Sequence, residues 1–216
     1  MKQLAIFDLD GTLADSFPWF LRVVNTVARR HGFRPILPDE IEMLRGKSTC
    51  EILDLLDVPA WKLPFIARDV RRMKSQAMSE IALFDGVDAM LAELDAKGVT
   101  IALVSSDSEA NVRRTLGDSA RFVADFACGA SLFGKAAKFD RILRRAGIPA
   151  DGTVAIGDEV RDGEAARQAG VSFGAVSWGY ASVEALQRLN PDFVFANMAE
   201  IPRKLSQLGE LVPARV

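Results

Sequence analysis

The sequence predicts an α/β protein in which a parallel, Rossmann-like sheet has helices on both faces and carries an inserted all-helical unit. First, its strand-like segments are short and apolar throughout, as expected for strands that are buried on both faces. Second, these segments alternate with helical patterns after residue 80, which is the order of a parallel sheet. Third, residues 16–80 contain helical patterns and no strand pattern.

The composition of the 216-residue chain fits a globular protein with a sizeable core, because 49% of its residues are hydrophobic. A formal net charge of −2 gives no electrostatic attraction to nucleic acid or to an anionic membrane. No apolar run approaches the roughly 18 residues that span a bilayer, and we expect no signal peptide. Cys50 and Cys128 fit two reduced, buried thiols better than a disulfide. We therefore expect a cytoplasmic protein with no nucleic-acid or membrane partner, either a monomer or a homodimer.

The first predicted strand, residues 4–7, leads directly into the most informative stretch of the chain, Asp8-Leu9-Asp10-Gly11-Thr12-Leu13. Asp8 and Asp10 are two residues apart, so both side chains point to the same face of an extended strand. The two carboxylates repel each other, and a divalent cation with a preference for oxygen ligands would compensate them. Gly11 allows the backbone to leave the strand and to approach a ligand closely.

Residues 16–80 are predicted to be a separate helical unit inserted into an α/β core domain formed by residues 1–15 and 81–216. Its predicted helices cover residues 17–30, 39–44, 48–56 and 61–80. The single histidine, His31, stands at the end of the first of these helices and is expected to be structural. Arg45 and Lys47 flank Gly46 in a predicted loop. This basic pair is consistent with contacts to an anionic substrate and also with a solvated helix end.

The rest of the core is predicted to alternate between strands and helices. The strands cover residues 99–104, 122–127, 153–156, 171–176 and 192–195, and the helices cover residues 84–97, 108–116, 135–146, 159–169, 182–189 and 198–208. Ligands bind at the carboxyl ends of the strands in such sheets. Asp8 with Asp10, Ser105 and Asp158 each follow an apolar strand directly, so we expect three strands to bring them to one site.

In this order, these residues resemble the four motifs of the haloacid dehalogenase-like superfamily, most of whose members are phosphatases. The motifs are Asp8-x-Asp10, then Ser105 after Ile-Ala-Leu-Val, then Lys135 at a helix start, and finally Gly157-Asp158-Glu159-Val160-Arg161-Asp162. The resemblance covers nearly the whole chain.

The resemblance implies hydrolysis of a phosphate monoester, with Asp8 as the nucleophile that forms an aspartyl-phosphate and Asp10 as the general acid and then the general base. It implies Mg²⁺ as cofactor, bound by the Asp8 carboxylate, the Asp10 backbone carbonyl and the Asp158 carboxylate, with Asp162 behind these ligands. The phosphoryl group would be bound by Ser105, Ser106 and Lys135.

Several residues allow a second interpretation. Ser105 is equally consistent with capping the helix near residue 108. Lys138 lies one turn after Lys135 and competes with it as the motif lysine. Asp162 is also compatible with a surface position, and we expect Glu159 and Arg161 to be solvated.

The helical insertion, residues 16–80, resembles the helical cap of this superfamily, and its place between the first and second motifs is like that in the phosphoglycolate phosphatase branch. The expected substrate is therefore a small phosphorylated metabolite similar to phosphoglycolate. A β-phosphoglucomutase-like phosphomutase, which has the same acids and cap type, is the alternative. A non-catalytic interaction module of the same fold is a more distant alternative. Asp10 favours a phosphatase or a phosphomutase over a dehalogenase, which protonates no leaving alkoxide.

Overall fold

The computed structural model describes residues 3–129 and 134–211, and its centre is a six-stranded parallel sheet in the order β3-β2-β1-β4-β5-β6. The strands are β1 (Leu4–Asp8), β2 (Thr100–Val104), β3 (Asp125–Ala127), β4 (Thr153–Gly157), β5 (Ser172–Val176) and β6 (Phe193–Phe195). The predicted α/β class is therefore confirmed. The first strand, β1, lies between β2 and β4 in the sheet.

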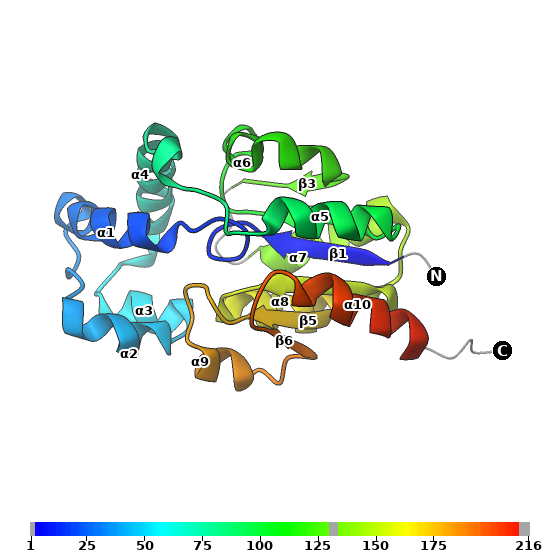
Figure 1. The fold of residues 1–216 in the computed structure, drawn as a ribbon. Helices are drawn as coiled ribbons and strands as arrows, with labels where there is room; N and C mark the ends of the chain where they lie inside the picture. Colours follow the sequence, from blue (N-terminus) through cyan, green and yellow to red (C-terminus); the bar gives the residue numbers. More distant parts are fainter. Residues whose placement is uncertain (1–2, 130–133, 212–216) are drawn as a thin grey trace.

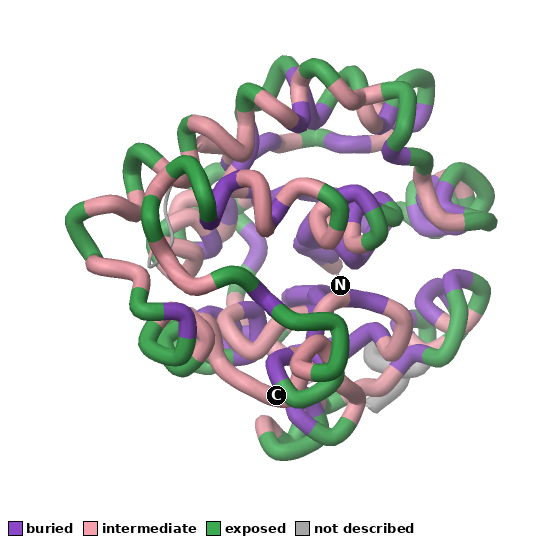
Figure 2. The backbone as a smooth tube through the Cα atoms, turned by 90° about the vertical axis from the view of Figure 1, so that its left-hand side faces the viewer, coloured by how far each residue is buried: buried purple, intermediate pink, exposed green. Residues whose placement is uncertain are grey.

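Helices cover both faces of this sheet (Figure 1). One face packs against α5 (Val87–Ala96), α6 (Glu109–Leu116) and α10 (Glu200–Leu211), and the other packs against α7 (Lys135–Ala146), α8 (Val160–Ala169) and α9 (Val183–Gln187). Side chains of β1 alternate between the two cores, with Ala5 and Phe7 on one side and Leu4 and Ile6 on the other. This is why residues 4–7 of β1 are apolar and why all five positions of the strand are buried. Figure 2 shows buried stretches in the interior of the chain and exposed positions mostly on its outer turns.

The helical insertion, residues 16–80, which we call the cap, lies beyond the carboxyl ends of the strands, at the opposite end of the molecule from the start of β1 and the end of α10 (Figure 1). Its helices are α1 (Phe17–His31), α2 (Ile41–Arg45), α3 (Thr49–Leu55) and α4 (Leu63–Gln76). They surround a small core of their own, built on Val24, Ile36, Leu44 and Leu56. Among the described residues, no helix combines the length and the apolar content that crossing a membrane requires.

The chain passes between the sheet and the cap twice, and the two passages pair with each other. The Asp15 amide donates to the Ala82 carbonyl, and the Phe84 amide donates to the Leu13 carbonyl, each over 2.9 Å. Ala14 and Leu83 form an antiparallel bridge between these bonds. We call this short pairing the seam.

Three local predictions differ from the structure. The helix predicted over residues 61–80 consists of α4 between two short 3₁₀ turns, because Pro64 lies in the first turn of α4 and the helix ends before Ala77. The strand predicted over residues 122–127 shortens to β3, because residues 117–122 form a 3₁₀ helix. The two cysteines are free, as predicted, but Cys50 is exposed and Cys128 is only half-buried, so the prediction of two buried thiols is wrong.

Candidate active site

Three carboxylates meet at the carboxyl edge of the sheet. Asp8 ends β1, Asp158 follows β4 directly, and Asp162 lies in the first turn of α8. All three are buried, and one ligand oxygen from each lies within 4.8 Å of the others. Because β1 and β4 are neighbours in the sheet, the order of the strands explains how residues 150 positions apart in the sequence come together. Asp162, which also fitted a surface position, belongs to this buried group.

Lys135 is the lysine that reaches the acids. Its Nζ lies 2.7 Å from Oδ2 of Asp8 and also pairs with the Asp162 carboxylate. Lys138 instead donates to the backbone carbonyls of Ser105 and Gly129, each over 2.7 Å. Burial disfavours the charged form of Asp8, but Lys135 and Arg161 outweigh this and lower the pKa of Asp8. The nucleophile candidate is therefore held as a carboxylate.

Asp158 is fixed by the loop after β1 and by the loop after β5. The Thr12 hydroxyl donates to its Oδ1 over 2.6 Å, and the Tyr180 amide donates to its Oδ2 over 2.8 Å. Gly11 has φ +78°, and a Cβ atom there would collide with the Asp158 carboxylate. Position 11 therefore requires glycine, because the backbone there approaches the Asp158 carboxylate closely, as predicted from its place after the strand. Burial, and then the charges of the neighbouring acids, raise the pKa of Asp158 well above its usual range.

The charges of this site fit a divalent cation. The three clustered aspartates and the adjacent Glu159 face two cationic side chains, Lys135 and Arg161. With every group ionised, the site would carry two net negative charges. Carboxylate oxygens at this separation are the ligands that hard divalent ions prefer. The donor set is therefore suited to such an ion, which would favour the ionised form of Asp158.

The Asp10 carboxylate has a different counter-ion. Lys74, which lies on α4 of the cap and is only 4% exposed, places its Nζ 2.6 and 2.7 Å from the two carboxylate oxygens of Asp10. The same Nζ is 3.2 Å from Oδ2 of Asp107. Burial opposes the charge on Lys74, but Asp10 and Asp107 outweigh it and raise the pKa of this lysine. Asp8 and Asp10 are thus compensated by two separate lysines.

Lys74 was not predicted as a site residue, because it lies in a helix with several other basic residues. One signal could have identified it. Lys74 lies four residues after Val70 and three before Ala77, and both of these pack against the core of the sheet domain. A lysine in such an apolar stripe needs an acidic partner when it is buried.

The loop after β2 contains three serines with different environments. Ser105 is buried, and its Oγ accepts a hydrogen bond from the Asp107 amide over 3.1 Å. The N-cap of α6 is Ser108, whose Oγ accepts from the Asn111 amide over 3.3 Å, so the interpretation of Ser105 as the helix cap is wrong. The Ser106 carbonyl accepts from Arg71 of α4 over 3.4 Å.

Both basic residues around Gly46 border the cavity, but each has a protein partner. Arg45 donates to the carbonyls of Gly179 and Tyr180, each over 3.0 Å, and so ties the cap to the loop after β5. Lys47 pairs with Glu51 over 3.3 Å.

Glu159 and Arg161 are bound to each other rather than solvated. Their side chains are 2.6 Å apart and 20% and 22% exposed. The expectation that both are solvated is wrong, because the start of α8 turns them toward the acidic cluster.

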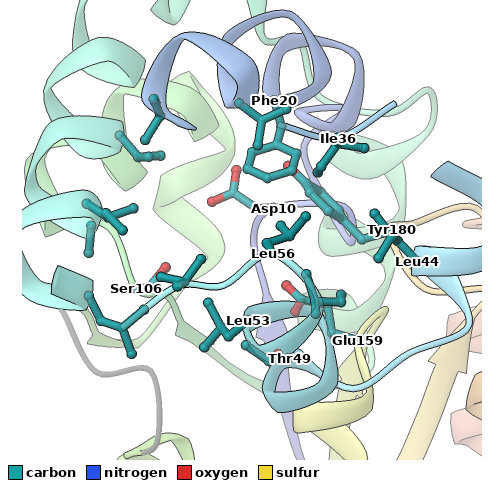
Figure 3. A pocket seen from close by; sticks show the side chains of 18 of the residues that line it. Asp10, Phe20, Ile36, Leu44, Thr49, Leu53, Leu56, Ser106, Glu159 and Tyr180 are labelled. Carbon is teal, nitrogen blue, oxygen red and sulfur yellow. The ribbon is translucent and has the colours of Figure 1, made fainter. Parts of the chain in front are cut away.

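A cavity of about 670 Å³ lies between the cap and this edge of the sheet. Asp10, Ser106 and Glu159 border it from the sheet side, and Phe20, Leu53 and Leu56 border it from the cap (Figure 3). The cavity therefore joins the polar site to the interior of the cap.

Known proteins share this sequence pattern and this fold. A family model described as haloacid dehalogenase-like hydrolase matches residues 5–176. A phosphoglycolate phosphatase of Synechococcus elongatus is 28% identical over 208 residues, which cover 95% of this chain and 98% of that protein. One of Xylella fastidiosa is 31% identical over 192 residues, covering 84% and 83%. The structure of a haloacid dehalogenase-like hydrolase from Streptococcus pneumoniae superposes with a TM-score of 0.76 at 19% identity, covering 94% and 98%, and shares the fold.

Proposed function

The chain belongs to the family of haloacid dehalogenase-like hydrolases, and from this premise we propose that it is a Mg²⁺-dependent phosphatase acting through Asp8. Its substrate is a small phosphate monoester, and the reaction passes through an aspartyl-phosphate. The observation that carries the proposal is the buried Asp8 carboxylate, paired with Lys135 at the carboxyl edge of the sheet. Such an arrangement supplies a nucleophile next to a cation that can hold a phosphoryl oxygen.

The reaction has two steps in this proposal. An Oδ atom of Asp8 attacks phosphorus, the bond from phosphorus to the alcohol oxygen breaks, and Asp10 donates a proton to the leaving alkoxide. Water then attacks phosphorus, Asp10 accepts a proton from this water, the bond from phosphorus to the Asp8 oxygen breaks, and inorganic phosphate leaves with Asp8 restored as a carboxylate. Lys74 orients the Asp10 carboxylate, because it binds both of its oxygens. In this proposal, Ser105, Ser106 and Lys135 hold the phosphoryl oxygens.

The carboxylates of Asp8 and Asp158 and the backbone carbonyl of Asp10 would hold Mg²⁺, with Asp162 beside them. The grouping of three carboxylates within 4.8 Å and the excess of negative charge support this assignment. When bound, the ion supplies neutralisation of charge between Asp8 and the phosphoryl group. Thr12 and the Tyr180 amide keep Asp158 in place for it.

The test is the release of free phosphate from a panel of phosphate monoesters with Mg²⁺, including phosphoglycolate, for the wild-type protein and Asp8→Asn. We expect the variant to fold normally and to fall below about 0.1% of the wild-type rate, because the amide cannot attack phosphorus. Asp151→Asn, an exposed aspartate just before the amino end of β4 and so at the opposite end of this strand from Asp158, is the matched control.

Acid quenching during turnover should trap one phosphoryl group on the peptide that contains Asp8, as measured by mass spectrometry. Retained activity in Asp8→Asn would remove this residue from the nucleophile role. Phosphoryl transfer to a second sugar position, with no free phosphate, would instead show a phosphomutase.

A further inference from the structure

The part of the cavity above the polar site is apolar. Its lining from the cap includes Phe20, Val24, Ile36, Leu53, Leu56 and Ile66. Leu53 lies on α3 and Ile66 on α4, and both are half-buried and border the cavity. Its volume of about 670 Å³ is in the range of sites that enclose a whole small molecule.

The cations around this cavity are already engaged by protein groups. Among the described residues, Arg45 binds two backbone carbonyls, and Lys47, Lys74 and Arg161 each pair with a carboxylate. Arg71 binds the Ser106 carbonyl and so lies at the polar end, where the phosphoryl group belongs. A second anionic group on a substrate would therefore enter the apolar part without a dedicated counter-ion, at a considerable cost in free energy.

From these two observations we infer that the cap cavity binds a predominantly apolar alcohol group, so that the enzyme prefers alkyl or aryl phosphates without a second charge over phosphoglycolate. The inference rests on the proposed phosphatase function and specifies its substrate class. The phosphoryl end lies by Asp8 and Asp10, and the apolar end lies between α3 and α4. Phosphoglycolate, with two carbons and a carboxylate, would leave most of the cavity unfilled.

The first experiment compares ethyl, butyl and hexyl phosphate with phosphoglycolate as substrates of the wild-type protein with Mg²⁺. Each buried methylene group contributes about 0.8 kcal/mol, so kcat/KM should rise about fourfold for each one. Hexyl phosphate has four more methylene groups than ethyl phosphate, so its kcat/KM should be about 250-fold higher. A flat alkyl series, or a preference for phosphoglycolate over hexyl phosphate, would overturn the inference.

Variants then locate the apolar end. Leu53→Asn and Ile66→Asn should each lower the ratio of kcat/KM for hexyl over ethyl phosphate about tenfold. The matched controls are Leu55→Asn on α3 and Phe65→Asn on α4, which are 41% and 46% exposed and do not border the cavity. These controls should leave the ratio unchanged. Equal effects of both pairs would contradict a bound chain between the two helices.

A binding measurement separates failure of this inference from failure of the proposed function. Hexylphosphonate cannot be hydrolysed, and its affinity can be measured by calorimetry with Mg²⁺ present. Tight binding that Leu53→Asn weakens, without turnover of any ester, would reject the phosphatase function but keep the apolar site. Turnover of esters with no dependence on chain length would keep the phosphatase and reject the apolar site.

Discussion

At the scale of single residues, the site depends on two lysines that come from different parts of the molecule. Lys135 belongs to the sheet domain and compensates Asp8 and Asp162, whereas Lys74 belongs to the cap and compensates Asp10 and Asp107. Each lysine touches two carboxylates, so its loss removes the direct ion pairs of both. Such losses are among the most destabilising single changes in proteins.

Lys135→Met should lower the free energy of unfolding by about 3–5 kcal/mol, because Asp8 and Asp162 stay buried and lose the cation that pairs with them directly. Added Mg²⁺ should recover part of this loss, since it binds carboxylates of the same cluster in the folded chain only. Urea unfolding with and without Mg²⁺ measures both effects. The comparison variant, Lys138→Met, loses two hydrogen bonds to backbone carbonyls. Added Mg²⁺ should not recover the free energy of unfolding that this variant loses. Equal stability of Lys135→Met and wild type would show that the cluster needs no lysine.

The residues that sequence reasoning identified and those it missed differ in what positions them. Asp8, Ser105 and Asp158 follow strands directly, so the fold alone predicts that they meet. Lys74 reaches Asp10 across 64 positions, and Thr12 reaches Asp158 across 146. Their roles depend on how the cap and the loops pack, which no local pattern contains.

At the scale of elements, local signals set most helix boundaries. His31-Gly32 was predicted to stop the first helix, and Gly32 has φ +64° and closes α1 through a bond from its amide to the Ala28 carbonyl. The less accurate boundaries lie where proline or a 3₁₀ segment interrupts a helical or strand-like pattern, as in residues 60–80 and 117–122. The packing of α1 on α4 uses a polar contact in addition to apolar ones. Asp69 of α4 binds Arg30 at 2.7 Å and His31 at 3.1 Å.

Asp69→Asn should lower the thermal unfolding midpoint at pH 7, because it removes the ion pairs that join α1 to α4. The Arg30 side chain lowers the pKa of Asp69 below 3.8, so ionised Asp69 stabilises the folded state above that pH. The stabilisation by ionised Asp69 is lost as the pH falls through the lowered pKa of this residue. The thermal unfolding midpoints of the wild type and of Asp69→Asn should therefore converge at that pH. Scanning calorimetry between pH 7 and the acid limit of folding measures the difference. Asp54→Asn, at an exposed position on α3, should keep the unfolding midpoint of the wild type at each pH. A difference between Asp69→Asn and the wild type that stays constant at every pH would exclude an ionic origin.

At the scale of the whole molecule, the clustered carboxylates and Lys135 belong to the sheet domain, and the cap contributes most of the residues that line the cavity. The sequence predicts a helical insertion with the motif residues outside it, because residues 16–80 contain no strand pattern. It did not predict how apolar the cavity is, since that depends on which faces of α3 and α4 turn inward. The cap nevertheless shares some packing with the sheet domain, because Trp19 belongs to the core beneath α5.

Replacing residues 17–80 with a short Gly-Ser linker should leave a sheet domain that folds, because the seam already brings the two ends together. Its stability should be reduced, since the site of Trp19 is emptied. Any remaining hydrolysis should show no preference between ethyl and hexyl phosphate, because the apolar lining is gone. Circular dichroism and the substrate ratio measure these outcomes. A chain without a cooperative unfolding transition would show that the cap is part of the folding core.

The ion pairs of Lys74 depend on the position of the cap. Its partners Asp10 and Asp107 are parts of the sheet domain, so their ion pairs exist only while the cap lies against the sheet. With the cap away from the sheet, Asp10 and Asp107 would lose this counter-ion and become hydrated. In the proposed reaction, the Lys74 ion pairs would therefore form only when the cap also shields the alcohol end of the ester.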